Sequence, residues 1–343
     1  MFQPKYKITN KLLANIKRIA ELSASLNGKS LSKTVLGALE KEARELSSFS
    51  STSIEGNPLP LTEAKRILKT KPENLRDTER EVINYNQTLE KLNKSLGQGF
   101  TTLTGKTILA IQQGITKGLI SKGRCGKFRQ EPVFINDPRR RQTVYWPPDH
   151  QEVKPLMSKL ISFINQNKTK IDPLILAGLF HKQFVIIHPF IDGNGRTARL
   201  ATKVLLAAMG LNVFNLFSFE NYYNRNVSKY FSRVGVLGNY YDIKKKINFT
   251  PWLEYFTDGI IDELLRVGKE MENISSSPLT SIKAHEQKLI NHIKEKGYIT
   301  DKAYSALTNR AKATRNKDFN RLIVLGLIKR EGKGKATFYK LAG

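Results

Sequence analysis

The sequence predicts a mainly α protein that carries one small β-hairpin and ends in a small mixed domain. Apolar residues recur at helical spacing over most of the 343 residues. One stretch near residue 140 has the pattern of two paired strands. A polar stretch, NISSSPLTS at 273–281, has the composition of a linker. With 40% hydrophobic residues, a chain of this length is expected to fold into two or three units.

The first part of the chain is expected to form an N-terminal helical region, 1–100. Over residues 12–46 apolar side chains recur at helical spacing, and Gly28 separates two helices. The next stretch, SSFSSTSIEGNPLPLTEAKRIL, is rich in Ser and Thr, which predicts a short, interrupted helix that the Gly-Asn-Pro run at 56–58 stops. Helical spacing resumes over 78–120, where two or three helices fit.

Residues 101–272 are expected to form a larger helical domain around a hairpin. The run VFINDPRRRQTVY, at 133–145, places β-forming residues on both sides of an Asn-Asp-Pro turn, which predicts a β-hairpin. Apolar periodicity predicts helices at 153–164, 173–187, 196–209, 218–236 and 250–274.

Beyond the linker, residues 282–343 have a different order of elements. The pattern predicts a helix, a short strand, two further helices and a hairpin, at 284–296, 297–300, 301–307, 311–325 and the C-terminal stretch LIKREGKGKATFYKLA. This order is typical of a winged helix-turn-helix domain. Such domains bind DNA or other proteins, and the sequence leaves both open.

The chain is strongly basic, with 57 Lys and Arg against 30 acidic residues and a net charge of +27. Such a field attracts nucleic acid, phosphate ligands or acidic proteins, although a solvated basic surface explains it equally well. Fifteen basic and five acidic residues lie in 282–343, which favours DNA as one partner. The predicted DNA-facing residues of the third helix and the wing are Arg310, Lys312, Arg315, Lys317, Arg321, Lys329, Arg330, Lys333 and Lys335.

The cysteine content points to a cytoplasmic protein. Cys125 is the single cysteine, so no intramolecular disulfide can form and a reducing compartment is expected. The first residues lack the apolar core of a signal peptide, and no run of about 18 apolar residues occurs. Neither export by that route nor a membrane partner is expected.

Residues 188–200, HPFIDGNGRTARL, carry an unusual concentration of reactive groups. His188 follows the apolar run FVII, so a buried helix can hold its ring rigidly as a general base. Gly193 and Gly195 permit positive φ and a close approach of backbone to ligand. Backbone N–H groups in such a loop, beside a helix N-terminus, bind anions such as phosphate.

The charged residues of the same loop complete a set suited to phosphate chemistry. Asp192 offers a hard oxygen ligand for Mg²⁺. Arg196 and Arg199 lie three residues apart on one helical face and can hold phosphate oxygens. Phosphoryl and nucleotidyl transfer depend on positioning and charge neutralisation, which these groups supply.

The string HPFIDGNGRTAR resembles the signature of the Fic family, His-Pro-Phe-x-Asp/Glu-Gly-Asn-Gly-Arg-x-x-Arg, at every specified position. The resemblance covers about residues 50–265 and implies a mainly helical core with a small hairpin, the flap, over the active site. It implies a protein adenylyltransferase, which uses ATP and Mg²⁺ to place AMP on a Ser, Thr or Tyr hydroxyl of a target protein or of itself. The presence of Gly195, which phosphate-transferring relatives have lost, favours AMP transfer.

The resemblance also implies a role for each residue of the motif. His188 would deprotonate the attacking hydroxyl, and Asp192 would hold Mg²⁺. The remaining positions would bind the phosphates of ATP: Gly193, Asn194 and Gly195 as a cradle, Arg196 at the α- and β-phosphates, and Arg199 at the γ-phosphate.

A second, shorter stretch, STSIEGN, resembles the Fic inhibitory motif Ser/Thr-x-x-x-Glu-Gly/Asn at Ser51, Glu55 and Gly56. Composition alone would make it an ordinary capped helix end. The resemblance implies that Glu55 pairs with Arg199 and keeps ATP from binding productively. In some relatives this glutamate serves the removal of AMP, so de-AMPylation remains open.

Three further hypotheses concern partners. The exposed edge of the flap can pair with an extended target segment, and Arg139, Arg140 and Arg141 at its tip would favour acidic targets unless they are only a solvated turn. Tyr230 is the first candidate for contact with adenine, with a core position as the alternative. A DNA-binding regulator that uses nucleotide as an effector is the competing function. The target and the oligomeric state, a homodimer included, stay open.

Overall fold

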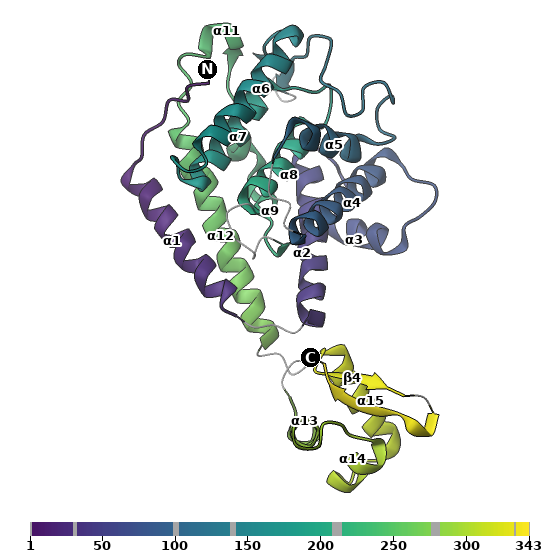
Figure 1. Cartoon of the computed structure of the whole chain (residues 1–343). Coiled ribbons are helices and arrows are strands. Elements are labelled where there is room, and N and C mark those ends of the chain that lie inside the picture. Colours follow the sequence, from purple (N-terminus) through teal and green to yellow (C-terminus); the bar gives the residue numbers. More distant parts are fainter. Residues whose placement is uncertain are drawn as a thin grey trace. The chain divides into compact units, whose positions relative to one another are not determined.

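A computed structural model describes residues 2–29, 33–98, 103–137, 142–207, 215–275, 282–332 and 334–342 (Figure 1). The fold is mainly α with a few short strands, as predicted. The chain divides into two compact units, Met1–Asn27 with Glu42–Leu265 and Gly28–Lys41 with Arg266–Gly343.

The larger unit holds most of the helices. In chain order its elements are α1 (Asn10–Asn27), the greater part of α2 (Lys33–Ile54), α3 (Leu61–Thr70), α4 (Asp77–Gly97), α5 (Gly105–Thr116), β1 (Ile135–Asp137), β2 (Gln142–Trp146), α6 (His150–Asn167), α7 (Pro173–Ile187), α8 (Asn194–Ala207), α9 (Phe219–Arg225), α10 (Val227–Val234), β3 (Gly238–Asn239), α11 (Tyr240–Ile243) and the first part of α12 (Thr250–Ser275).

Two predictions for this unit are wrong in detail. The Ser- and Thr-rich stretch does not interrupt α2, because the hydroxyls of Ser48 and Thr52 donate to backbone carbonyls one turn back, at 2.7 and 2.9 Å. The single helix expected at 218–236 is two helices, α9 and α10. They part at Asn226, whose side-chain oxygen accepts a hydrogen bond from the backbone N–H of Lys229 and so caps α10.

Helix α7 lies at the centre of the larger unit and is buried on almost every side. Asp172 caps its N-terminus by accepting from the N–H of Leu174 at 2.8 Å, and Pro173 occupies the first turn. Gly178 lets α12 approach closely, since the indole of Trp252 donates to the Gly178 carbonyl at 2.8 Å. Helix α8 packs against α7, α5 and α4. The loop between α7 and α8 is therefore supported by the most buried part of the fold.

The predicted hairpin is confirmed as β1 and β2, which pair antiparallel with a register irregularity after Ile135. Strand β3 pairs with β2 in parallel, so the sheet order is β1-β2-β3 and β1 is an edge strand of the described sheet. The tip with Arg139, Arg140 and Arg141 lies outside the described residues.

The C-terminal part of the smaller unit has the element order that the sequence predicts. It contains α13 (Ala284–Lys296), α14 (Asp301–Leu307), α15 (Lys312–Val324), β4 (Ile328–Glu331) and β5 (Phe338–Leu341). The short strand expected at 297–300 is a single bridge between Ile299 and Tyr339. These elements enclose their own apolar core, which includes Leu289, Tyr304, Phe319 and Tyr339. Helix α12 continues to Ser275, into the predicted linker, and 276–281 lie outside the described residues.

Three of the arginines predicted to face DNA are engaged inside the C-terminal unit. Arg310 donates to the buried Asp318 at 2.8 and 3.1 Å. Arg315 holds both carboxylate oxygens of Asp301 at 2.8 Å. Arg321 pairs with the fully buried Glu286. These guanidiniums neutralise acids within the domain, so the prediction of a third helix lined with DNA-facing arginines is wrong for these three positions.

No helix in the described part of the chain combines the length and the apolar character that a membrane span requires.

Replacing Gly178 with alanine is expected to lower the free energy of unfolding by about 1–3 kcal/mol, because the new methyl would lie 2.6 Å from Leu253 Cδ2. Gly97→Ala is the matched control, since its methyl meets no atom within 4 Å. That variant is expected to be neutral or stabilised by up to about 1 kcal/mol. Urea unfolding followed by far-ultraviolet circular dichroism measures both. Equal stability of the two variants would contradict the close contact between α7 and α12.

Candidate active site

The candidate site begins where α7 ends. His188 is the C-cap residue of α7 and adopts the left-handed conformation, with φ of 50° and its N–H donating to the Phe184 carbonyl. This conformation is unfavourable for a residue with a side chain, so neighbouring contacts must hold it. It turns the chain sharply from a buried helix into the loop 188–194.

Arg129 supplies those contacts, and sequence reasoning missed it. Its Nε donates to the His188 carbonyl and its backbone N–H to the Pro189 carbonyl, both at 2.9 Å. The rest of the guanidinium donates to the carbonyls of Glu131 and Pro148. Burial lowers the pKa of Arg129. One buried arginine thus ties the loop of the candidate base to the segments on either side of the flap.

The ring of His188 is oriented as a general base requires. Its Nδ1 lies 3.3 Å from the Val185 carbonyl oxygen, which can only accept, so Nδ1 carries the proton of the neutral ring and Nε2 keeps a lone pair. Burial, to which the Arg129 charge adds, lowers the pKa of His188 to about 4 despite the opposing hydrogen bond to Val185. The imidazole is therefore neutral at pH 7.

The loop closes on itself before α8 begins. The side-chain amide of Asn194 accepts from the Phe190 N–H at 2.9 Å and donates to the Phe190 carbonyl at 2.8 Å. Asn194 therefore shapes the loop with its side chain. The backbone N–H groups of Asn194, Gly195 and Arg196 are the first three of α8, and they have no hydrogen-bond partner among the described residues. Three such groups at a helix N-terminus form an anion site.

The two glycines of the motif are required for different structural reasons. Gly193 has φ of +81°, and a β-carbon there would lie 3.0 Å from Thr116, so both its backbone and its packing require glycine. Gly195 lies within α8 and does not have the positive φ that the sequence suggested. A methyl group on Gly195 would overlap Oε1 of Glu55. The second glycine therefore makes room for the carboxylate of Glu55, the residue that directly follows α2.

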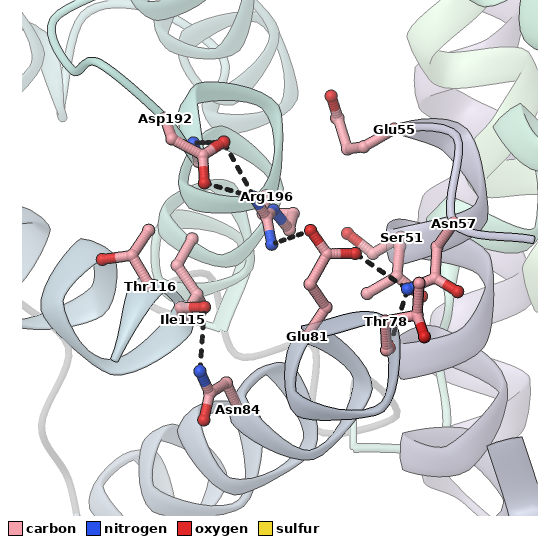
Figure 2. A network of polar contacts seen from close by, with 12 residues as sticks. Ser51, Glu55, Asn57, Thr78, Glu81, Asn84, Ile115, Thr116, Asp192 and Arg196 are labelled. Carbon is pink, nitrogen blue, oxygen red and sulfur yellow. Dashed lines mark hydrogen bonds and ion pairs between the residues drawn. The ribbon is translucent and has the colours of Figure 1, made fainter. Parts of the chain in front are cut away.

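Asp192 and Arg196 face each other across the first turn of α8. Arg196 Nη2 donates to both carboxylate oxygens of Asp192 at 2.9 Å, while Nη1 donates to Glu81 of α4 at 3.1 Å (Figure 2). The side chain of Arg196 is 3% exposed and that of Asp192 is 41% exposed. An accessible carboxylate beside a helix N-terminus suited to phosphate fits Mg²⁺, which commonly takes one or two carboxylates and the phosphates of a substrate.

Arg199 is paired with the predicted inhibitory residues. Its Nη2 donates to Glu55 Oε1 at 2.7 Å and to the Ser51 carbonyl at 2.9 Å, and its Nε donates to the Ser51 hydroxyl at 2.8 Å. The Arg199 side chain is 0% exposed and that of Glu55 is 30% exposed. Burial acts to lower the pKa of Arg199, but the Glu55 carboxylate together with Tyr230 and Tyr85 offsets this and leaves the pKa raised. The guanidinium is therefore held as a charged partner of α2.

Gly56 explains why Glu55 points toward Arg199. The N–H of Gly56 donates to the Ser53 carbonyl, and the N–H of Asn57 donates to the Thr52 carbonyl, while Gly56 has φ of 95°. This pair of hydrogen bonds around a left-handed glycine is a Schellman motif, which ends α2 at Ile54. Glu55 thus occupies the capping position, where the chain leaves the helix beside α8.

Tyr230 does not face a nucleotide site. Its side chain is 1% exposed, its ring stacks on Tyr223 at 4.5 Å, and its hydroxyl lies 3.2 Å from His181 Nε2. The prediction of an adenine contact is wrong here, and the alternative of a core position is right. The hydroxyl also accepts a hydrogen bond from Arg199 Nη1 at 3.4 Å, so Tyr230 contacts this arginine from within the core.

Comparisons with known proteins agree with this geometry. Residues 102–206 match the profile of the Fic/DOC family. The chain is 29% identical over 201 residues to protein adenylyltransferase Fic of Drosophila willistoni, with 57% of this chain and 39% of the relative covered. It is 29% identical over 217 residues to protein adenylyltransferase Fic of Drosophila melanogaster, with 58% and 42% covered. The chain thus spans about two fifths of the length of these curated relatives.

Solved structures share the fold. A Fic family protein from Desulfovibrio desulfuricans G20 has a TM-score of 0.66 and 21% identity, with 100% of this chain and 99% of that chain covered. Fic-1 (residues 134–508) from C. elegans has a TM-score of 0.61 and 21% identity, with 76% and 73% covered. The matched family profile spans α5, the flap, α7, the loop of His188 and most of α8. Residues 102–206 of this chain therefore form a Fic domain, of the Fic/DOC family.

Proposed function

We propose that this protein is a protein adenylyltransferase that transfers AMP from ATP to a hydroxyl side chain of a target protein, and that Glu55 restrains it. The observation that carries the proposal is the convergence of a neutral histidine, a carboxylate, two arginines and three backbone N–H groups that have no partner among the described residues, where α7 leads into α8. The curated relatives that share this domain are named protein adenylyltransferases.

The chemistry assigned to the site is a single displacement at the α-phosphorus of ATP. Nε2 of His188 takes the proton of the target hydroxyl as its oxygen forms a bond to the α-phosphorus. The bond from that phosphorus to the bridging oxygen of the β-phosphate breaks, and pyrophosphate leaves. The N-terminal N–H groups of α8 and the guanidinium of Arg196 bind phosphate oxygens. Asp192 would hold Mg²⁺, which would supply further neutralisation of phosphate charge.

Glu55 restrains this reaction by occupying groups that the nucleotide needs. Arg199, the proposed partner of the γ-phosphate, already bonds to Ser51 and Glu55 through two of its three nitrogens. The carboxylate of Glu55 also lies against Gly195, at the helix end where phosphate would bind. A triphosphate would meet a negative group there and would bind out of line for attack. Removal of AMP by a site that keeps Glu55 is the alternative reaction.

The target is proposed to bind along the flap. Strand β1 has a free edge in the described sheet, and such an edge can add an extended segment of another chain through backbone hydrogen bonds. Phe134, which directly precedes β1, is 58% exposed and can contact a side chain of that segment. This mode fixes a hydroxyl beside His188 without requiring a strict sequence around it.

A nucleotide-responsive DNA-binding regulator is the second candidate. We propose that residues 282–343 form a winged helix, and the observation in favour of DNA is the exposed face of α15, which carries Lys312, Asn316, Lys317 and Asn320. Binding of the full chain to duplex DNA at rising salt tests it, with Lys312→Ala/Lys317→Ala for comparison. A regulator requires affinity that falls with salt and weakens in this variant. Affinity unaffected by both changes would exclude this face.

Glu55→Gly is expected to raise AMP transfer by at least about tenfold, because Arg199 becomes available to the nucleotide. His188→Ala in the same background is expected to abolish transfer. Intact-mass spectrometry of the protein after incubation with ATP and Mg²⁺ measures its own modification. A parallel incubation with a cell lysate, whose proteins are afterwards digested and searched for AMP adducts, measures transfer to targets. Equal adduct formation by the wild type and Glu55→Gly would remove the restraint from this account. Loss of AMP from a modified target only while Glu55 is present would assign the reverse reaction.

The rate of AMP transfer by Glu55→Gly is expected to be flat on the acid side of neutrality. His188 must be neutral to accept a proton, and its pKa of about 4 keeps it neutral as the pH falls through 6.5. The rate should decline only as the pH approaches 4. A pH profile of kcat/KM from pH 5 to 8, with far-ultraviolet circular dichroism to verify folding, checks this. A halving of the rate near pH 6.5 would show an unperturbed imidazole.

A further inference from the structure

A chain of four side chains connects the turn after α2 with the loop of the site (Figure 2). Asn57 Nδ2 donates to Glu81 Oε2 at 2.8 Å, and Arg196 Nη1 donates to Glu81 Oε1 at 3.1 Å. Arg196 Nη2 then reaches both oxygens of Asp192 at 2.9 Å. Glu81 stands in the middle of this chain, and neither sequence motif includes it.

We propose that Glu81 is a positioning residue that fixes Arg196 for contact with the α- and β-phosphates, and that Asn57 fixes Glu81. The inference rests on the proposed function to the extent that it takes Arg196 as a phosphate ligand. It adds a part of the site that comes from α4, outside the loop of His188.

The hydrogen bonds of Arg196 show why a second carboxylate is needed. Asp192 takes all of Nη2, and Asp192 is also the proposed Mg²⁺ ligand. With Asp192 engaged by a metal ion, Nη2 would be available to a phosphate oxygen, and the guanidinium would lose the partner that orients it. Glu81 holds the opposite nitrogen, Nη1, and so keeps Nη2 directed at the loop. A long, flexible side chain is thereby pre-organised before the nucleotide arrives.

Glu81 is itself held in one pose by Asn57. The same Nδ2 of Asn57 donates to the Thr78 carbonyl at 2.8 Å, one turn before Glu81 on α4, and Oδ1 accepts from the Leu59 N–H at 3.1 Å. Asn57 is buried, so its amide has a single set of partners. Because Asn57 directly follows Gly56 in the Schellman turn, the end of α2 contacts Arg199 through Glu55 and Arg196 through Asn57 and Glu81. The first contact occupies an arginine, and the second orients one.

The experiment compares nucleotide binding and AMP transfer in the Glu55→Gly background. Glu81→Gln keeps the shape of the side chain and removes its charge. We expect it to weaken binding of Mg²⁺·ADP and Mg²⁺·ATP by the same factor, about tenfold or more, because both nucleotides carry the α- and β-phosphates. The KM for ATP should rise in parallel.

Two further variants complete the design. Glu90→Gln is the matched control on the same helix, because Glu90 pairs with Lys94 at the surface, and its ADP affinity should equal that of the parent. Asn57→Ala leaves the Glu81 charge in place and should weaken ADP binding in the same direction by a smaller factor, so it tests the proposal if Glu81→Gln does not fold. ADP affinity within twofold of the parent in both Glu81→Gln and Asn57→Ala would overturn it. Calorimetry with ADP needs no catalysis, so failure of AMP transfer alone would count against the proposed function and not against this inference.

Discussion

The fully buried guanidinium of Arg199 is the constraint on which the rest of the site depends. A charge in the core must be matched by hydrogen bonds and by an opposite charge, because removing it from water is costly. The partners come from two other parts of the larger unit: Ser51 and Glu55 at the end of α2, and Tyr230 on α10.

That requirement explains several neighbouring features. Helix α2 must end at the level of α8, which the Schellman turn at Gly56 achieves, and α8 must have no side chain at Gly195. Tyr230 must be buried with its hydroxyl toward the arginine, and it is therefore lost to any role at the surface. The same residues therefore determine both the packing around Arg199 and the electrostatics of the site.

Sequence reasoning identified the parts whose information is local. The buried helix 173–187, the hairpin and the loop of His188 each carry their signal within a short window, and all three were predicted. Arg129, Gln112 and Glu81 carry no such signal. Gln112 donates to the Asp192 carbonyl at 3.2 Å and accepts from the Gly126 N–H, yet in the sequence it is one of two glutamines on an ordinary helix. The partners of all three lie far away along the chain, so only the tertiary fold brings them together.

The same limit explains the errors. Helical spacing cannot distinguish a core tyrosine from one at a ligand site. Counting arginines cannot show that acids in the same domain neutralise them.

The shared space of Gly195 and Glu55 has a consequence for how relatives of this chain can diverge. A β-carbon at position 195 and a carboxylate from position 55 claim the same volume, so the two positions are not free to change independently. A descendant that acquires a side chain at 195 must displace the Glu55 carboxylate from its present position at the same step. A lineage that has lost the glycine therefore has to reposition the residue at 55 as well, and the contact between Glu55 and Arg199 changes with it.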